Sequence, residues 1–199
     1  RLAKPPLPTW VGGLVELACP GSLAAQRVPA AIMASLWTLF TLLIARRLTG
    51  RNDFAIVTTV VFLTLYNVVL MGRSATWDIY CHSFMMGAIY FLIKGLKDAS
   101  DAGVWGWLLA AGAMMGLSFL GKGPVSFYAL LLPFAIAFCL WWRPATMRGK
   151  WLPLAASVAV ALVVGGAYYA WLVGYHLPEL QQVAPRESGA WGNHNVRPW

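Results

Sequence analysis

The stretch WLPLAASVAVALVVGGAYYAWLV, residues Trp151–Val173, decides the class of fold. It contains no charged residue and is long enough for a helix to cross the hydrocarbon core of a bilayer, which takes about 20 mostly apolar residues. The whole chain has the same character, since 59% of its residues are hydrophobic and 11% are charged, whereas soluble domains carry about 25% charged residues. The sequence therefore predicts an integral membrane protein.

Five further apolar runs of near-spanning length precede this one: Val28–Ala45, Phe54–Gly72, Ile79–Ile93, Val104–Leu120 and Val125–Trp142. We therefore expect an all-α, polytopic transmembrane helix bundle with about six spans over 28–173. External loops at 1–27 and 174–199 flank these spans, and residues 1–199 are expected to be part of one transmembrane domain. The stretch Pro8–Cys19 fits either a helix lying in the membrane interface or a plain loop. The chain lacks an initiator methionine and ends abruptly, so we expect it to be an internal piece of a longer protein.

Two features predict how the spans pack. The run Ile79–Ile93 is short and begins with Cys81 and His82, so it must be lengthened by Trp77 and Leu96, tilted, or packed inside the bundle. In the next run, a pair of glycines at small-xxx-small spacing allows two helices to approach closely. This pair is Gly112 and Gly116. Helix packing is the role that we expect for it.

The basic residues report membrane orientation rather than a nucleic-acid partner. The net charge is +8, but the basic residues are scattered between apolar runs and form no sustained stripe. Eight of them follow the first, third and fifth spans: Arg46, Arg47, Arg51, Lys94, Lys97, Arg143, Arg148 and Lys150. The alternate turns hold only Arg73 and Lys122. Because cytoplasmic loops are enriched in Lys and Arg, both chain ends are expected outside.

Polar side chains gather on that external side, where we therefore look for chemistry. They are Lys4, Arg27, Arg73, Asp78, Lys122, Arg186, Glu187 and His194. The three cysteines are different, because Cys19, Cys81 and Cys139 lie far apart without the paired spacing of a disulfide framework or a metal site. They are interpreted as small structural residues.

Four motifs match one family in order and spacing. They are KPPLPTW at Lys4–Trp10, QRVPA at Gln26–Ala30, GRSATWD at Gly72–Asp78 and GLSFLGKGP at Gly116–Pro124. Over nearly its whole length, the chain resembles the GT-C superfamily of polytopic glycosyltransferases that includes protein O-mannosyltransferases and lipid A aminoarabinose transferase. The resemblance implies a cell-envelope enzyme of the bacterial inner membrane. Such an enzyme moves a hexosyl or pentosyl group from a polyprenyl-phosphate carrier to a lipid, glycan or protein acceptor on the external face.

The carrier phosphate needs cations at the membrane boundary. Lys4 is the first candidate, because the adjoining Pro5 and Pro6 hold it on a stiff, extended segment, and the resemblance places the corresponding lysine near the donor phosphate. The alternative for Lys4 is a basic flank of the kind that many membrane helices carry. Arg186 and Lys122 are further candidates for the phosphate contact. Their alternatives are an exposed loop arginine and a snorkelling lysine at a helix end.

Transfer also needs an acid or base, for which Asp78 is the candidate catalytic residue in this chain. An ionisable group at the end of a span is costly unless it is paired or lines a wet cavity. The structural alternatives for Asp78 are an ion pair with Arg73 or a contact with the helix N-terminus. His82, one turn later, shares its helical face or is a buried, hydrogen-bonded histidine. The resemblance implies that the main general base lies upstream of Arg1.

Two further candidates and a metal complete the site prediction. Relatives carry a glutamate and often a histidine near the donor pocket, to which Glu187 and His194 loosely correspond. Some relatives also have a glutamate directly before the motif lysine, in a position suggested for metal contact, whereas this chain has Ala3. No cofactor is therefore assigned, and a divalent metal stays an open alternative.

Two other classes of protein share these features. A polytopic transporter or lipid-linked sugar flippase would also have spans and embedded charges, but its site would lie near the membrane midplane. The charges of this chain gather at one membrane face instead. A non-enzymatic assembly subunit would give no reason for the lysine-proline segment, so we favour the transferase.

Overall fold

The computed structural model describes residues 5–74, 76–98, 101–142, 149–176 and 178. These residues form helices joined by turns, with no strand among them. In chain order the elements are α1 (Leu7–Ala18), α2 (Leu23–Thr49), α3 (Asn52–Thr64), α4 (Tyr66–Ser74), α5 (Trp77–Ile93), the π-helical segment η1 (Lys94–Asp98), α6 (Asp101–Lys122), the π-helical segment η2 (Phe127–Leu131), α7 (Leu132–Trp142) and α8 (Trp151–Tyr175). The predicted all-α class is confirmed.

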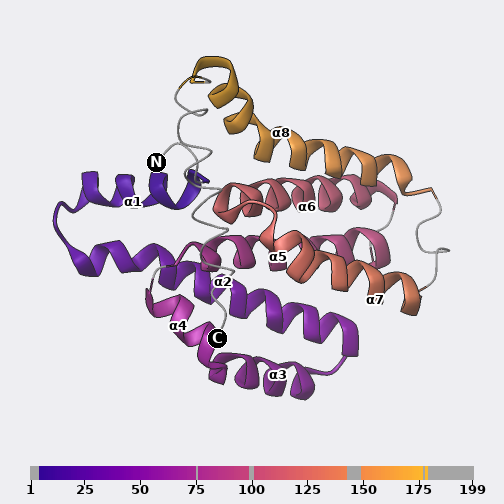
Figure 1. Ribbon diagram of the computed structural model, residues 1–199. Helices are drawn as coiled ribbons and strands as arrows, with labels where there is room; N and C mark the ends of the chain where they lie inside the picture. The colour runs from indigo at the N-terminus through magenta and orange to yellow at the C-terminus, as the bar shows by residue number, and fades with distance from the viewer. Residues whose placement is uncertain (1–4, 75, 99–100, 143–148, 177, 179–199) are drawn as a thin grey trace, which may run out of the picture.

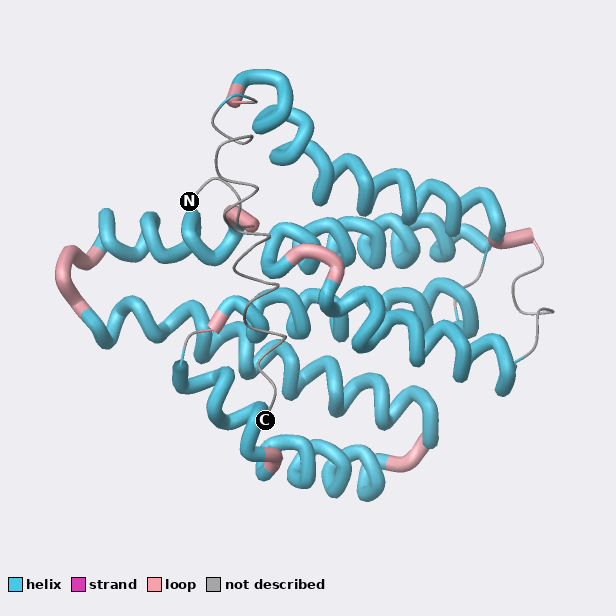
Figure 2. The backbone as a smooth tube through the Cα atoms, in the orientation of Figure 1, coloured by secondary structure: helices cyan, strands magenta, loops and turns pink. Residues whose placement is uncertain are grey.

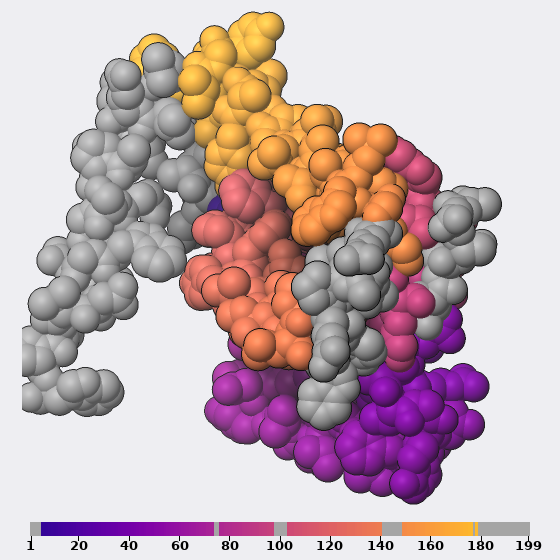
Figure 3. Space-filling view, turned by 90° about the vertical axis from the view of Figure 1, so that its right-hand side faces the viewer, coloured from indigo at the N-terminus to yellow at the C-terminus, as the bar shows by residue number. Residues whose placement is uncertain are grey.

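The helices are arranged around a central pair. Figure 1 shows α5 and α6 side by side in the middle of the bundle, with α8 on one side and α2, α3 and α4 on the other. Seen end-on in Figure 3, α2 and α3 occupy one side of the molecule, and α7 and α8 occupy the other. The pairs α5–α6, α6–α8 and α2–α5 make the main contacts between helices.

Four helices are long and apolar enough to cross a membrane: Leu23–Thr49, Trp77–Lys97, Gly103–Lys122 and Trp151–Tyr175. The prediction of an integral membrane protein is therefore confirmed. Their burial differs, because 67% of the apolar window within Trp77–Lys97 is buried, against 22% for α2 and 17% for α8. The short third run is thus the core helix of the bundle, begun at Trp77 and lengthened through η1.

The second expected span is bent rather than straight. Its two parts, α3 and α4, meet at an angle of 65°, and Figure 2 shows the break as a short loop between them. Leu65 takes up an extended conformation there, while the Thr64 hydroxyl donates to the Val61 carbonyl at 2.7 Å. Such side-chain bonds compete with the helical ladder and bend helices. Neither proline nor glycine marks this break.

The fifth expected span, Val125–Trp142, is helical over its whole length. The apolar helix found within it, Phe127–Leu140, is shorter than the roughly 20 residues needed to cross the hydrocarbon core, so it is not counted among the spanning helices. The π-helical η2 opens this helix and ends at Leu131, two residues before Pro133. Proline has no N–H to donate to the preceding turn, so the widened backbone accompanies the loss of one helical hydrogen bond. Among the described residues, four helices are thus long and apolar enough to span a membrane, or up to five when the bent pair counts as one.

The N-terminal stretch forms helix α1, as one of the two sequence interpretations predicted. Its last turn is tied to α2, because the Glu16 carboxylate accepts hydrogen bonds from the Gly21 N–H at 2.9 Å and from the Gln26 side chain at 2.8 Å. These two donors lower the pKa of Glu16. At the other end of α1, the Trp10 ring meets Tyr168 of α8 edge-on, with centroids 5.6 Å apart. Helix α1 therefore bridges the ends of α2 and α8.

The glycine pair lies where α6 packs against α8, as predicted. A Cβ at Gly112 would lie 2.2 Å from the Ser157 carbonyl oxygen, and a Cβ at Gly116 would lie 2.5 Å from the Val164 side chain. Real side chains cannot come so close, so the two helices touch only because both positions lack a Cβ. Small residues allow such approaches in membrane bundles, where packing and hydrogen bonds hold the helices together.

We predict that Gly112→Ala lowers the melting temperature of the full-length protein in detergent. The added methyl collides with backbone, and overpacking of this kind costs about 1–3 kcal/mol. Gly106→Ala on the same helix is the matched control, because nothing lies within 4 Å of its Cβ position. The control should keep or raise stability, since alanine favours helix by about 0.5–1 kcal/mol. Equal melting temperatures for both variants would contradict the packing role.

Candidate functional site

An ion pair joins the two central helices at one end of the bundle. Lys122, the last residue of α6, donates from Nζ to Oδ1 of Asp78 at 2.5 Å. Asp78 lies in the first turn of α5, where the helix dipole also favours a negative charge. The Lys122 side chain is 35% exposed and the Asp78 side chain is 22% exposed. The pair is therefore partly buried and not a solvated surface contact. The helix ends thus hold a fixed pair of opposite charges at the rim of the bundle.

Close approach of the two backbones positions this pair. A Cβ at Gly121 would lie 3.0 Å from the Cys81 backbone nitrogen, so the end of α6 can reach α5 only with glycine at this position. One turn earlier, the buried Ser118 hydroxyl donates to the Cys81 carbonyl at 2.7 Å. Ser118, Gly121 and Lys122 follow i, i+3, i+4 spacing, which places them on one helical face. That face of α6 is directed at the start of α5.

The turn that follows α6 is fastened to the same place. The hydroxyls of Ser118 and Ser126 lie 2.5 Å apart, and both side chains are fully buried. Gly123 has a φ of +70°, a left-handed conformation that glycine adopts without a steric penalty. Its N–H donates to the Phe119 carbonyl at 2.7 Å. The GLSFLGKGP motif therefore ends a helix and fixes the lysine beside α5.

The ion pair of Asp78 is not made with Arg73, which was one of the structural alternatives. Arg73 is exposed near the end of α4 and lines a pocket with Arg27. The other alternative, a position at the helix N-terminus, is observed, since Asp78 follows the N-cap residue Thr76 within the first turn. Sequence distance suggested the arginine, but the antiparallel packing of α5 and α6 brings in the lysine from 44 residues away.

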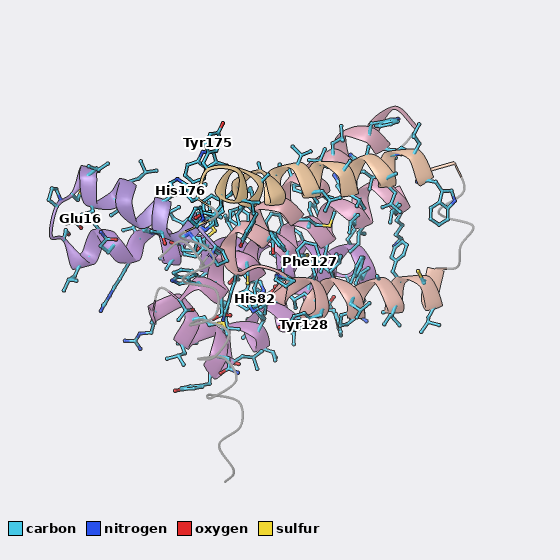
Figure 4. All side chains as sticks on the ribbon, turned by 45° about the horizontal axis from the view of Figure 1, so that its top comes forward. Glu16, His82, Phe127, Tyr128, Tyr175 and His176 are labelled. Atoms are coloured by element: carbon cyan, nitrogen blue, oxygen red, sulfur yellow. The ribbon has the colours of Figure 1, made fainter. Side chains whose placement is uncertain are left out.

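His82 shares the face of α5 with Asp78, as one interpretation predicted. Figure 4 shows it within the bundle, away from Glu16 on α1. Its ring lies 5.3 Å from the Trp37 ring, measured between centroids, and Nδ1 lies 3.7 Å from the Cys81 sulfur. The metal-ligating atoms of Asp78, Cys81 and His82 all lie within 4.8 Å of one another. This trio is the cluster of metal-ligand residue types among the described residues.

The trio does not fit a metal ion as it is arranged. The Lys122 ammonium already occupies the carboxylate of Asp78, in the place that a cation would take. The Cys81 sulfur donates to the Asp78 carbonyl at 3.4 Å, so Cys81 is a thiol, whereas metals bind the thiolate. In this arrangement the Asp78 carboxylate binds the lysine rather than a metal ion.

One hydroxyl beside the ion pair has no assigned partner. The Oγ1 atom of Thr76 is buried and forms no hydrogen bond with any residue that the structure describes. Buried polar groups are nearly always satisfied, and each exception asks for an explanation. Thr76 is therefore a further polar residue at the start of α5, two positions before Asp78 in the sequence.

An apolar groove begins beside the same rim. It has a volume of about 500 Å³, and it is lined by Met115, Phe119, Pro124, Phe127, Leu131, Val158, Ala161, Leu162, Gly165 and Gly166. These residues come from α6, η2 and α8. Phe119 and Pro124 flank Lys122 in the sequence, so the lining of the groove includes residues on both sides of this lysine in the chain. An apolar groove whose lining flanks a cation in this way suits a ligand with a charged head and an apolar chain.

Four sequence candidates lie outside the described residues: Lys4, Arg186, Glu187 and His194. Their predicted roles remain predictions. Among the described candidates, the structure brings Asp78, Lys122 and His82 together and leaves Arg73 in a separate pocket. Ser118 and Gly121 were not singled out for the site by sequence reasoning, although their spacing from Lys122 would have placed all three on one face.

The helix bundle and its four sequence motifs belong to a known family of membrane proteins. The chain is a member of the dolichyl-phosphate-mannose-protein mannosyltransferase family, whose sequence model matches residues 3–169. All four motifs fall within that match, so the family resemblance drawn from them is confirmed. No protein of curated function matches the chain.

Solved structures of similar fold come from one enzyme. ArnT from Cupriavidus metallidurans in the apo state is 26% identical, with a TM-score of 0.69. The same protein bound to undecaprenyl phosphate is 25% identical, with a TM-score of 0.72. Each match covers 88% of this chain and 32% of ArnT. The chain thus spans about a third of the length of the structures that it resembles.

We predict that Asp78→Asn and Lys122→Met each lower the melting temperature and that combining them recovers part of the loss. A single change leaves a partly buried charge unpaired. Its cost should lie between the roughly 1 kcal/mol of exposed pairs and the 3–5 kcal/mol of buried ones. A double-mutant cycle in detergent measures the coupling. Arg73→Gln combined with Asp78→Asn is the control and should recover nothing; recovery there, with none from Lys122→Met, would assign the pair to Arg73.

Proposed function

We propose that the protein is a membrane glycosyltransferase that takes a sugar from a polyprenyl-phosphate carrier and passes it to an acceptor on the external face. The observation that carries the proposal is the Asp78–Lys122 ion pair, whose lysine lies between Phe119 and Pro124 of an apolar groove in the sequence, in a chain of a mannosyltransferase family. ArnT, which has a similar fold, has been solved with undecaprenyl phosphate bound, and this supports a polyprenyl-phosphate carrier.

In this proposal Lys122 contacts the carrier phosphate. An ammonium has three N–H donors, and the bond to Asp78 uses one of them. The other two are left for phosphate oxygens. As the bond between the sugar and the phosphate breaks, negative charge grows on the phosphate, and a fixed cation stabilises it without reorganising. The isoprenoid chain lies in the groove that Phe119 and Phe127 help to line.

Asp78 acts in this proposal as a positioning residue. Its carboxylate already accepts a hydrogen bond from Lys122, so it holds the ammonium in place. The attacking hydroxyl or amine needs a general base, which the family resemblance implies upstream of Arg1. Lys4 and Arg186 complete the phosphate contacts expected from the sequence. The sugar leaves the carrier between these cations and the base.

The test is transfer of a sugar from a polyprenyl-phosphate donor by the full-length protein in detergent. Lys122→Ala and Lys4→Ala should each lower turnover about a hundredfold or more, as expected when a preorganised donor to a developing anion is lost. Lys122→Arg should retain more activity, because it keeps the charge. Lys94→Ala is the matched control. Lys94 lies in η1, directly after α5, and its ammonium lies over the Trp107 ring of α6. Wild-type turnover in Lys122→Ala would remove this lysine from the site.

Adding Asp78→Asn to Lys122→Ala distinguishes positioning from direct catalysis. A carboxylate that acts only through the ammonium adds little further loss once the ammonium is gone, because residues that work as a unit are not additive. A second, independent loss of about a hundredfold is expected of a positioned acid–base group. That outcome would show that Asp78 itself touches the reacting atoms.

The external orientation of this site predicts a labelling pattern in intact cells. Cys19 is exposed next to the end of α1, on the side that the loop charges place outside. An impermeant thiol reagent should therefore label Cys19 in a Cys139→Ala background. Replacing Cys19 by serine and placing a cysteine at Arg51, in the turn between α2 and α3, should abolish labelling until the cells are opened. Labelling of the Arg51 position in sealed cells would invert the topology.

A further inference from the structure

A pocket lined by two arginines lies at the same end of the bundle as the Asp78–Lys122 pair, on the other side of α5. Arg27, in the second turn of α2, and Arg73, near the end of α4, line a pocket of about 460 Å³ together with Tyr66 and Gly72. The ion pairs among the described residues involve Arg51 and Lys122 instead. The two guanidinium groups therefore share a pocket without an acidic partner in the part of the chain that the structure describes.

Two arginines in this position are unexpected on electrostatic grounds. The loop charges assign this end of the bundle to the side where positive residues are scarce. Both arginines are exposed, so water screens part of their mutual repulsion, and an anion between them would relieve the rest. The planar guanidinium matches the oxygens of a phosphate in a bidentate manner, and the hydroxyl of Tyr66 adds a further donor type. The pocket thus has the chemistry of a phosphate site.

An apolar groove continues from this pocket along α2. It has a volume of about 650 Å³ and shares Val69, Gly72 and Arg73 with the pocket. Its other residues come from α2, α3 and α4, including Leu39, Leu42 and Leu63. The 65° break between α3 and α4 turns α4 away from the line of α3 and shapes this groove.

A second, smaller groove runs beside the first. It has a volume of about 360 Å³ and is lined by α2 alone, from Val28 to Leu39. Ala31, Ser35 and Leu39 line both grooves, so the two lie next to each other below the arginines. A pocket with two arginines next to an open apolar surface along α2 suits a ligand with a phosphate head and apolar chains.

We propose that Arg27 and Arg73 bind the phosphate of an anionic membrane lipid whose chains lie in these grooves along α2. Basic pockets between transmembrane helices bind lipid head groups in this way. This lipid is distinct from the proposed sugar carrier, whose groove is formed by α6, η2 and α8. The inference goes beyond sugar transfer and does not depend on it. The bound lipid fills the space that the bend between α3 and α4 leaves against α2.

The experiment measures binding of phosphatidylglycerol to the full-length protein in detergent by native mass spectrometry. Arg27→Gln combined with Arg73→Gln should weaken binding about tenfold, while the pair of Arg→Lys changes at these positions should retain part of it. Arg46→Gln, an exposed arginine at the opposite end of α2, is the matched control and should bind as wild type. Melting temperatures without lipid show that each variant is folded. Equal binding by the wild type and the Arg-to-Gln double variant would overturn the proposal.

The groove is tested separately from the charges. Ser35→Trp places a large side chain where the two grooves meet and should weaken phosphatidylglycerol binding about as much as the arginine changes do. Thr58→Trp on α3 is its control, because Thr58 makes the same kind of bond to a preceding carbonyl and is not among the groove residues. Unchanged lipid binding in a destabilised Ser35→Trp variant would show that another part of the protein fills the groove. That result would overturn the lipid assignment.

Three added ligands, compared by melting temperature, distinguish the source of the phosphate. Phosphatidylglycerol should raise the melting temperature of the wild type, whereas phosphatidylcholine, whose net charge is zero, should raise it less. Inorganic phosphate at the same concentration should have little effect, because it leaves the grooves empty. Equal stabilisation by inorganic phosphate would assign the pocket to a free anion and overturn the lipid proposal. None of these readouts requires sugar transfer, so failure here and failure of the proposed function are separate results.

Discussion

The contact between the end of α6 and the start of α5 organises this bundle. At that point Gly121 brings two backbones together, Ser118 ties them by a hydrogen bond, and Lys122 reaches Asp78. Each part needs the others, because a lysine on a looser helix would turn toward solvent and leave the carboxylate unpaired. Since an unpaired charge at the end of a span is costly, the ion pair and the close packing hold each other in place. Phe119 and Pro124, which flank this contact in the sequence, line the apolar groove.

The two sides of the central pair are used differently. On the α8 side, the glycines of α6 bring the helices into contact, and the apolar groove opens near their ends. On the α2 side, polar bonds help to hold the helices, as when Ser83 of α5 donates to the Met33 carbonyl at 2.7 Å. Helix α5 is therefore fastened on both faces, which suits the helix that carries Asp78 and His82.

Much of the fold can be predicted from the sequence, because few backbone structures can cross the hydrocarbon core of a bilayer. The runs that became α2, α5, α6 and α8 were predicted from length and apolar content alone, and the packing of Gly112 and Gly116 from their spacing. The break at Leu65 was not predicted. It depends on a threonine side-chain bond and on packing against α2 rather than on a proline. Asp78 and Lys122 were both expected at the site, but their pairing needs the antiparallel arrangement of α5 and α6. Sequence distance favoured Arg73 instead.

The bend between α3 and α4 also affects the bilayer around it. At about 1.5 Å per residue, the 13 residues of α3 rise about 20 Å, and the 9 residues of α4 add only about 6 Å along the same axis when inclined by 65°. With α3 upright, the pair covers roughly 26 Å of a hydrocarbon core that is about 30 Å thick. Lipids meet such a mismatch by thinning. The membrane should therefore dip beside α4, so that its head groups descend to the depth of Arg73.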